Sequence, residues 1–250
     1  MAGNDNDRAG TRTGSLEEHN LFREVTATLE TLKVPYWLDQ GTLLGIIREG
    51  RLLRTDHDLD LGLWGEDYLK NRGEILRCLQ KKGRFIETYK PHQLTVTDLE
   101  GKFNMINLAF YRCEEGRAVK DVCYPVAGPV VKVLINTVLF CAHAREGTVE
   151  QKFAPGMRKT LSAAVAKIIP VPLWNILCYS AGRSQYYFRP FFKMAVDEKY
   201  FLNLETITLA GRKLPVPGNP QEYLALKYGP DWRVPRDRWL YWQDDGAISP

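Results

Sequence analysis

The sequence contains no uninterrupted hydrophobic run long enough to cross a bilayer. Its two longest apolar stretches, residues 127–144 and 161–179, are interrupted by Gly, Pro and Lys, whereas a spanning helix needs about 20 apolar residues in succession. The N-terminus shows no hydrophobic signal region, and the polar residues 1–14 are expected to form a disordered tail. These absences predict a chain without a spanning helix, and they leave peripheral contact with a membrane open.

Cysteine patterns of the metal-binding and disulfide-rich classes are also missing. The five cysteines form neither a CxxC pair nor a set with zinc-ligand spacing. Most of them stand in apolar surroundings, where a free cysteine behaves as a small core residue. An odd number of such cysteines suits a reducing compartment, so we expect a cytoplasmic protein.

Neither sign of charge dominates the chain, whose formal net charge is only +4. Basic residues do not alternate with aromatic ones, so nucleic acid is not an expected partner. Positive charge is concentrated in residues 145–193, which hold eight Lys or Arg and two Glu. This segment is either a solvated helical face or a surface for an anionic lipid, an anionic polymer or a phosphorylated donor.

The clearest positive feature is the stretch Asp56-His57-Asp58-Leu59-Asp60. On a strand, residues two apart point to the same face, so Asp56, Asp58 and Asp60 are expected to project together while the leucines turn toward a core. Three carboxylates on one face repel one another unless a cation lies among them. Mg²⁺ and Mn²⁺ favour carboxylate oxygens, and Mg²⁺ is commonly shared with substrate phosphates. The stretch therefore predicts a metal-dependent, phosphoryl-type transferase with these three aspartates as metal ligands and catalytic residues.

Two other interpretations of the acidic stretch fit less well. A calcium loop of the EF-hand type that begins at Asp56 needs Gly at its sixth position, where this chain has Leu61. A merely solvated acidic strand does not explain the leucines beside the charges. His57 faces away from the aspartates by alternation, which favours packing or hydrogen bonding over metal ligation.

A glycine turn upstream suits phosphate binding. We expect a turn at residues 40–42 and a short helix over residues 43–48. Gly41 would let the backbone approach a phosphate, Thr42 would supply a hydroxyl, and amides at the helix start would bind the anion. Arg48 would neutralise phosphate charge with its planar guanidinium.

The hydrophobic pattern predicts an α+β fold, in which a mixed sheet is flanked by helices. Helices are expected over residues 15–34, 43–48, 66–82 and 220–227. Strands are expected over residues 36–38, 59–64, 85–89, 93–97, 103–111, 200–201, 206–209 and 212–216. After the tail, residues 15–250 form a single domain, with a core at 15–125 and 200–240 and a helical basic insertion at about 128–193. The last twenty residues are expected to wrap irregularly over the surface. Their aromatic residues are interpreted as packing, with a platform for a sugar or base as the alternative.

Two sequence blocks resemble the LicD and fukutin-related family. Residues 41–50 read GTLLGIIREG and residues 56–62 read DHDLDLG, similar to the family signature GTLLGxxRxG followed by DxDxDxG. Residues 214–217 and 222–232, which read LPVP and EYLALKYGPDW, resemble its closing pattern. The resemblance is specific over residues 36–64 and 205–239 and weak between them.

The resemblance implies a nucleotidyltransferase-type fold and transfer of a phospho-alcohol from a CDP-activated donor, such as CDP-choline or CDP-ribitol, to a sugar hydroxyl. The acceptor would be a glycan or a cell-surface polymer, such as a lipopolysaccharide sugar or teichoic acid, and a lipid-linked acceptor is one hypothesis. The positions that match the family motifs are Gly41, Thr42, Arg48, Asp56, Asp58 and Asp60.

One position departs from the family pattern. Asn107 stands where nucleotidyltransferases usually have a carboxylate on a later strand, and an amide does not accept a proton as a general base. Asn107 is therefore expected to bind substrate or to offer a neutral oxygen to a metal. Either Asp98 or Asp121 replaces the missing acid, or activity is reduced, and Asp56 is a candidate proton acceptor. A nucleotidyltransferase that moves NMP from an NTP and an impaired nucleotide-binding homologue remain alternatives.

Overall fold

The computed structural model describes residues 19–53, 58–87, 92–98, 105–123, 191–209, 211–236 and 238–249. Asp56, His57 and residues 124–190 lie outside these ranges. Most of the predicted helical basic insertion therefore lies outside the described residues. None of the helices within these ranges has both the length and the apolar character that a bilayer-spanning segment requires.

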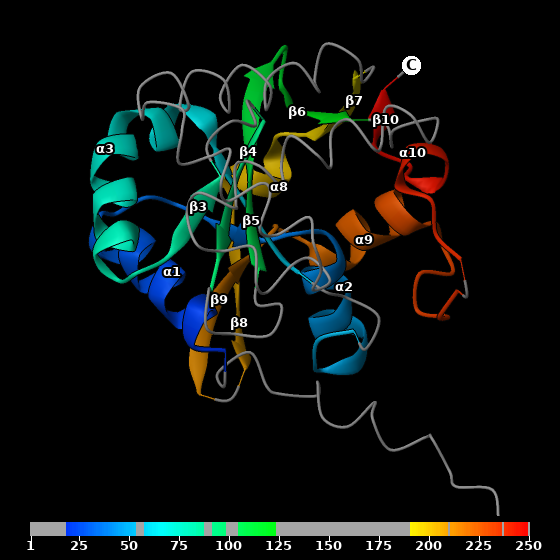
Figure 1. The fold of residues 1–250 in the computed structure, drawn as a ribbon. Helices are drawn as coiled ribbons and strands as arrows, with labels where there is room; N and C mark the ends of the chain where they lie inside the picture. The colour runs from blue at the N-terminus through cyan, green and yellow to red at the C-terminus, as the bar shows by residue number, and fades with distance from the viewer. Residues whose placement is uncertain are drawn as a thin grey trace, which may run out of the picture.

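Within the described residues, a mixed sheet of eight strands forms the centre of the fold (Figure 1). Its main path runs β1 (Trp37–Leu38), β2 (Leu59–Trp64), β5 (Met105–Glu114), β6 (Arg117–Cys123), β7 (Phe191–Asp197) and β10 (Ile248–Ser249). Strands β4 (Gln93–Thr97) and β3 (Phe85–Glu87) extend the sheet from the first half of β5. The pair β2–β5 is parallel and aligns Asp60 with Asn107. This register places the acidic strand beside the position where an acid is missing.

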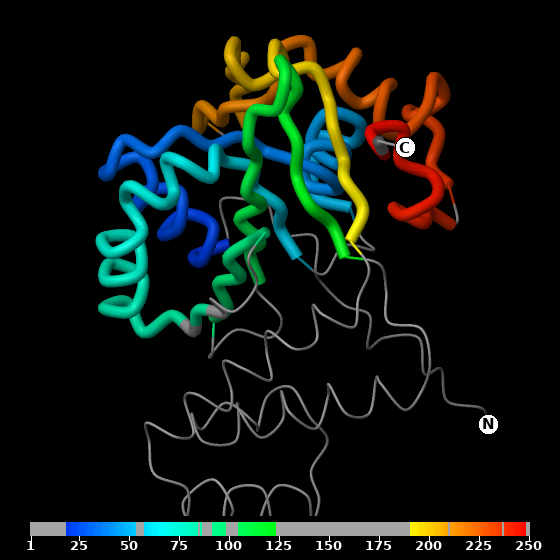
Figure 2. The backbone as a smooth tube through the Cα atoms, turned by 90° about the horizontal axis from the view of Figure 1, so that it is seen from above, coloured from blue at the N-terminus to red at the C-terminus, as the bar shows by residue number. Residues whose placement is uncertain are grey.

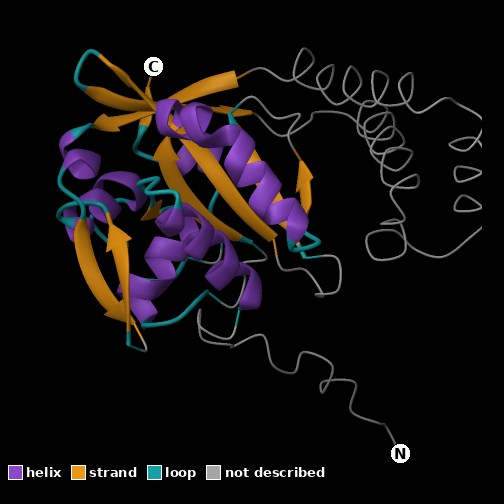
Figure 3. Ribbon diagram, turned by 90° about the vertical axis from the view of Figure 1, so that its left-hand side faces the viewer, coloured by secondary structure: helices purple, strands orange, loops and turns teal. Residues whose placement is uncertain are grey.

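Helices cover both faces of this sheet (Figures 2 and 3). Helices α1 (Asn20–Thr31) and α3 (Gly65–Lys81) lie on one side, and α2 (Gln40–Glu49) and α9 (Pro220–Tyr228) lie on the other. The short helices α8 (Lys199–Leu202) and α10 (Tyr241–Asp244) and the hairpin of β8 (Glu205–Leu209) with β9 (Arg212–Val216) complete the described part. The predicted α+β class, a mixed sheet flanked by helices, is confirmed.

Local sequence explains the elements that were predicted well. Strand β2 has the predicted limits, and its three leucines are buried, as alternation requires. Helix α1 buries Phe22, Val25 and Leu29 at helical spacing. Helix α2 ends at Gly50, whose φ of 67° is a left-handed C-cap that favours glycine.

Several predicted elements were wrong where long-range pairing decides the structure. Tyr200 and Phe201, expected in a strand, lie in α8. Strand β6 was not predicted, and β7 occupies residues 191–193, which were assigned to the helical insertion. The tail is not wholly irregular, because it contains α10 and β10, and β10 pairs with β7. Each of these elements depends on a partner strand or helix distant in sequence.

Trp37 is the centre of the aromatic core. It is fully buried, stacks on Phe201 at 4.3 Å between ring centroids, and contacts Trp64 edge to face. The β1–β2 register places Trp37 opposite Gly62. A Cβ atom at Gly62 would lie 2.2 Å from Trp37 Nε1. The glycine at the end of the acidic motif is therefore required by packing.

Gly62→Ala should destabilise the fold by about 3 kcal/mol, at the upper end of the usual cost of overpacking, because the stacked indole has no free space to move into. Urea unfolding measures the change. Gly73→Ala is the control, since a Cβ at that position in α3 meets no atom within 4 Å. Equal stability of Gly62→Ala and the wild type would contradict this account of the motif.

Candidate functional site

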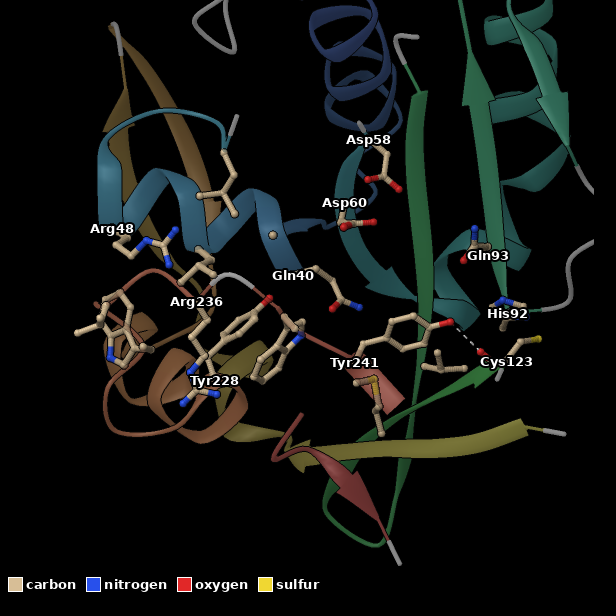
Figure 4. Close-up of a pocket in the computed structure, with 18 residues that line it drawn as sticks. Gln40, Arg48, Asp58, Asp60, His92, Gln93, Cys123, Tyr228, Arg236 and Tyr241 are labelled. Carbon is tan, nitrogen blue, oxygen red and sulfur yellow. Dashed lines mark hydrogen bonds between the residues drawn. The ribbon is translucent and has the colours of Figure 1, made fainter. Parts of the chain in front are cut away.

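A pocket of about 560 Å³ lies between the α2 side of the sheet and the segment that follows α9 (Figure 4). Gln40, Gly41 and Arg48 of α2 line it, as do Asp58 and Asp60 at the start of β2. His92 and Gln93 border it at the start of β4, and Cys123 does so at the end of β6. The pocket thus combines segments from both predicted sequence blocks.

Asn107 bridges the two described aspartates. Its Nδ2 donates to Asp58 Oδ2 at 2.7 Å and to Asp60 Oδ1 at 3.3 Å. Its Oδ1 accepts hydrogen bonds from Gln93 Nε2 at 3.1 Å and Thr95 Oγ1 at 3.0 Å. In this arrangement the Asn107 oxygen, predicted as a possible metal ligand, is directed to β4. The amide instead donates to the acids, because β4 holds its oxygen.

The two aspartates repel each other at this site. Burial, together with the charge of Asp58, raises the pKa of Asp60 to about 8, although Lys120 and the Asn107 hydrogen bond oppose the change. A carboxylate with a raised pKa binds either a proton or another cation. The pair therefore suits a positively charged ligand.

The described donor set fits a divalent cation that completes its coordination elsewhere. No group of three or more His, Cys, Asp or Glu side chains suited to a metal occurs among the described residues. Asp58 and Asp60 alone supply two hard oxygen donors in a pocket wall. Mg²⁺ is commonly held by one or two carboxylates while it keeps waters and contacts substrate phosphates. The site is compatible with such an ion.

The predicted turn at residues 40–42 is instead the first turn of α2, since the helix begins at Gln40 after the extended N-cap Asp39. Gly41 lines the pocket at this helix start. Thr42 is fully buried, and its hydroxyl accepts a hydrogen bond from the Asp60 backbone N–H at 2.8 Å. Thr42 therefore joins α2 to the acidic strand and is not among the residues that line the pocket.

Arg48 lies near the other end of α2 and also lines the pocket. Its side chain is 13% exposed and pairs with Glu49 at 2.8 Å. The buried Nε of Arg48 has no hydrogen-bond partner among the described residues. An unmet donor of a guanidinium suits an anionic or carbonyl oxygen of a ligand.

Asp39 was not singled out from the sequence, yet it is the most constrained acid of the described structure. It is fully buried and accepts hydrogen bonds from Tyr111 Oη at 2.6 Å, Tyr223 Oη at 2.8 Å and Lys120 Nζ at 3.1 Å. Burial raises the pKa of Asp39, but Lys120, Lys227 and the two hydroxyls outweigh it, so the pKa lies well below its usual range. The carboxylate stays charged.

A second buried ion pair extends this cluster to the C-terminal segment. Lys227 of α9 contacts Asp245 at 2.8 Å, and both side chains are 1% exposed. Since Tyr223 belongs to the same helix as Lys227, α9 is held at both residues. The second sequence block is therefore anchored to the first through the hydrogen bond from Tyr223 to Asp39.

Several site residues were missed or misassigned by sequence reasoning. His92, which belongs to neither sequence motif, lies in the pocket wall, as do Gln40 and Gln93. No local signal identifies His92, because the β4–β5 pairing brings it there. Asp98 and Asp121, the proposed substitutes for the missing acid, pair with Arg84 at 2.7 Å and Arg112 at 2.8 Å and do not line the pocket. Neither aspartate therefore lies in the pocket as a substitute for the missing acid.

Comparison with known proteins confirms the family resemblance over part of the chain. Residues 33–126 match the family model described as "LicD/FKTN/FKRP, nucleotidyltransferase domain". The "Ribitol 5-phosphate transferase FKRP" of Mus musculus is 47% identical over 45 residues, which are 18% of this chain and 9% of that protein. The "Ribitol-5-phosphate transferase FKTN" of Homo sapiens is 35% identical over 63 residues, which are 25% of this chain and 13% of that protein. The matches thus span a small part of these relatives.

A solved structure, the solution structure of the antibiotic-resistance factor ANT(2'')-Ia, has a TM-score of 0.32 and 15% identity to this chain. The match covers 70% of this chain and 95% of that chain. A likeness of this size supports no argument about the site.

Asp39→Asn should destabilise the fold by about 3–5 kcal/mol, because it leaves the buried Lys120 without its counter-charge. Because the folded pKa of Asp39 is lowered, its contribution is present above about pH 4 and is lost as the pH falls through the folded pKa. Urea unfolding between pH 3 and 7 should therefore show a weaker acid dependence in the variant.

Glu74→Gln is the matched control, since it removes an ion pair with Arg77 on the exposed face of α3. It should leave the unfolding midpoint unchanged. A similar loss of stability in both variants would mean that Asp39 has no special role in the fold.

Proposed function

We propose that this protein is a metal-dependent phosphotransferase that moves a phospho-alcohol, such as phosphocholine or an alditol phosphate, from a CDP-activated donor to a sugar hydroxyl of a glycan or cell-surface polymer. The observation that carries the proposal is the pair Asp58 and Asp60, bridged by Asn107 in the wall of a pocket that also contains Gly41 and Arg48. The names of the partial relatives favour ribitol phosphate as the transferred group.

In this proposal Asp58 and Asp60 would hold Mg²⁺ or Mn²⁺, with Asp56 as a further ligand from outside the described residues. The bound ion would neutralise the donor pyrophosphate and favour departure of CMP. Thr42 fixes the backbone of Asp60 through its hydroxyl, and Asn107 holds both carboxylates at one position. The protein thus orients its acids before any ligand binds.

The start of α2 would receive the phosphate oxygens. Gln40 and Gly41 lie at the N-terminal turn of a ten-residue helix and line the pocket. Backbone N–H groups of this turn have no partner within the helix, and the helix dipole favours an anion there. Arg48, near the other end of the same helix, would contact a different part of the donor.

The acceptor hydroxyl also needs a group that takes its proton when its oxygen attacks phosphorus and the bond to CMP breaks. Asp58 and Asp60 would be engaged by the metal, and an amide at residue 107 does not accept a proton. Among the described pocket residues, His92 has a side chain that ordinarily titrates near neutral pH. We assign this step to the His92 imidazole, with Asp56 as the alternative.

The acceptor would lie close to a membrane in the cytoplasm. The basic segment at residues 145–193 supports this position. A lipid-linked acceptor with an anionic carrier would suit such a segment, as would peripheral contact of the protein with an anionic membrane surface.

A donor screen tests the reaction class. The protein is incubated with Mg²⁺ or Mn²⁺, a panel of CDP-alcohols and NTPs, and acceptor glycans, and the products are analysed. Release of CMP from a CDP-alcohol is expected. Release of pyrophosphate from an NTP would support NMP transfer instead, and nucleotide binding without turnover would support the impaired homologue.

Asp58→Asn and Asp60→Asn should reduce CMP release below detection, because each removes a charged metal ligand. Asp60→Asn should also melt at or above the wild-type temperature without metal, since it relieves the repulsion from Asp58. Mg²⁺ at 100 times its Kd should stabilise the wild type by about 2.7 kcal/mol and leave Asp60→Asn unchanged.

Asp67→Asn serves as the control, because Asp67 lies in the first turn of α3 and does not line the pocket. It should keep both the turnover and the response to Mg²⁺. Wild-type turnover in Asp58→Asn or Asp60→Asn would refute the metal assignment.

His92→Gln should lower kcat by about 10²–10⁴-fold with little change in the KM of the donor, because a proton acceptor acts in the transition state. The acidic limb of the wild-type pH–rate profile should disappear. His19→Gln, at the N-cap of α1, is the control. An unchanged kcat in His92→Gln would assign the proton to another group, such as Asp56.

A further inference from the structure

The end of the pocket near Arg48 is aromatic as well as cationic. Arg48, Arg236 and Tyr228 lie together at this end, whereas His92, Gln93 and Cys123 lie at the other, with Asp58 and Asp60 between them (Figure 4). Trp232 and Trp239 also line the pocket. The site therefore has two ends of different chemistry on either side of the carboxylates.

The aromatic end is held in place by contacts of its own. The rings of Tyr228 and Trp239 lie 4.8 Å apart at an angle of 41°. The Arg236 guanidinium lies 5.5 Å from the Trp239 ring centroid and pairs with Asp231 at 2.6 Å. These contacts fix a tilted ring pair and a guanidinium beside a cavity, an arrangement that suits a flat ligand with polar edges.

Charge and position favour a nucleobase at this end. Asp231 pairs with Arg236, and Glu49 pairs with Arg48 while it also contacts Arg51 at 3.4 Å, so carboxylates offset part of the positive charge at this end. The remaining N–H groups of the guanidinium groups, including the unpartnered Arg48 Nε, suit neutral carbonyl oxygens such as those of a pyrimidine.

The length of α2 gives the right separation from the phosphate site. Arg48 follows Gly41 by seven residues, which is about 10 Å along a helix. A ribose and a base extend from a phosphate at the helix start over a comparable distance. A nucleotide along α2 would place its phosphates beside the carboxylates and its base beside Tyr228 and Trp239.

We propose that Tyr228, Trp239 and Arg236 form the subsite for the nucleobase of the donor. The base packs against the ring pair, and the guanidinium groups donate to its carbonyl oxygen. The assignment of this base to a CDP-alcohol rests on the proposed function, whereas the existence of a base subsite does not.

Binding of CMP and of ribose 5-phosphate, which carries a phosphate and no base, tests the subsite by titration calorimetry in the presence of Mg²⁺. Trp239→Leu should weaken CMP binding about tenfold or more, as expected for loss of one base–aromatic contact. It should leave ribose 5-phosphate binding unchanged. Trp239→Phe, which keeps a ring, should retain CMP affinity within about threefold of the wild type, since aromatic stacking tolerates exchange of the ring.

Trp242→Leu is the matched control, because Trp242 packs edge to face on Tyr241, is half-buried and does not line the pocket. It should change neither affinity. Equal weakening of both ligands in Trp239→Leu, unchanged CMP affinity in Trp239→Leu, or equal affinities of wild type for both ligands would overturn the subsite.

The outcomes separate this inference from the proposed reaction. A selective loss of CMP binding in Trp239→Leu without turnover of any CDP-alcohol would support the subsite and refute the transferase. CMP release by the wild type and Trp239→Leu with equal KM for the donor would support the transferase and refute the subsite. If Trp239→Leu weakened binding of the acceptor sugar alone, this end of the pocket would belong to the acceptor, and the nucleobase subsite would be refuted.

Discussion

The buried carboxylate of Asp39 is the constraint on which the rest of the site depends. It receives hydrogen bonds from Tyr111 of β5, Lys120 of β6 and Tyr223 of α9, and Asp39 itself is the residue that directly precedes α2. Removal of Lys120 would leave a buried charge without its counter-charge, which is costly, and removal of either hydroxyl would take away one of its hydrogen bonds. Four elements that are distant in sequence are therefore held in one arrangement, and the pocket lies among them.

Asp58 and Asp60 are in the opposite situation, because nearby positive charge does not fully balance their negative charge. Asp58 and Asp60 are held side by side by a single amide of Asn107, whose oxygen is in turn held by Gln93 and Thr95. This chain of hydrogen bonds holds two repelling carboxylates together in the pocket wall, beside the buried Asp39 cluster. A protein commonly sacrifices local stability at a functional site in this way. Compared with a carboxylate at this position, Asn107 avoids further repulsion of Asp58 and Asp60, but it does not accept a proton.

The pocket is composite, and its two ends are built from different parts of the chain. Helix α2 and the acidic strand supply Gly41, Arg48 and two carboxylates, whereas the segment after α9 supplies aromatic rings and Arg236. Lys227 and Asp245 bind this segment to the body of the protein, and Tyr241 Oη donates to the Cys123 carbonyl at 3.2 Å. The two blocks that resemble the family in sequence are thus two walls of one cavity. Their separation along the chain explains why neither block alone reveals the cavity.

The sequence by itself determined the class of fold, the limits of β2, and the acidic and glycine motifs, because alternation and helical spacing are local properties of a strand or helix. It also identified Asn107 as the unusual position. Only the tertiary structure decided that Thr42 faces Asp60, that Asp39 is the central buried acid, and that His92 and Trp239 border the same pocket. It also decided that Tyr200 and Phe201 are helical and that β6, β7 and β10 join the sheet. These features depend on contacts between distant segments, such as the hydrogen bond from Tyr223 to Asp39, which are 184 residues apart, and no local pattern encodes such contacts.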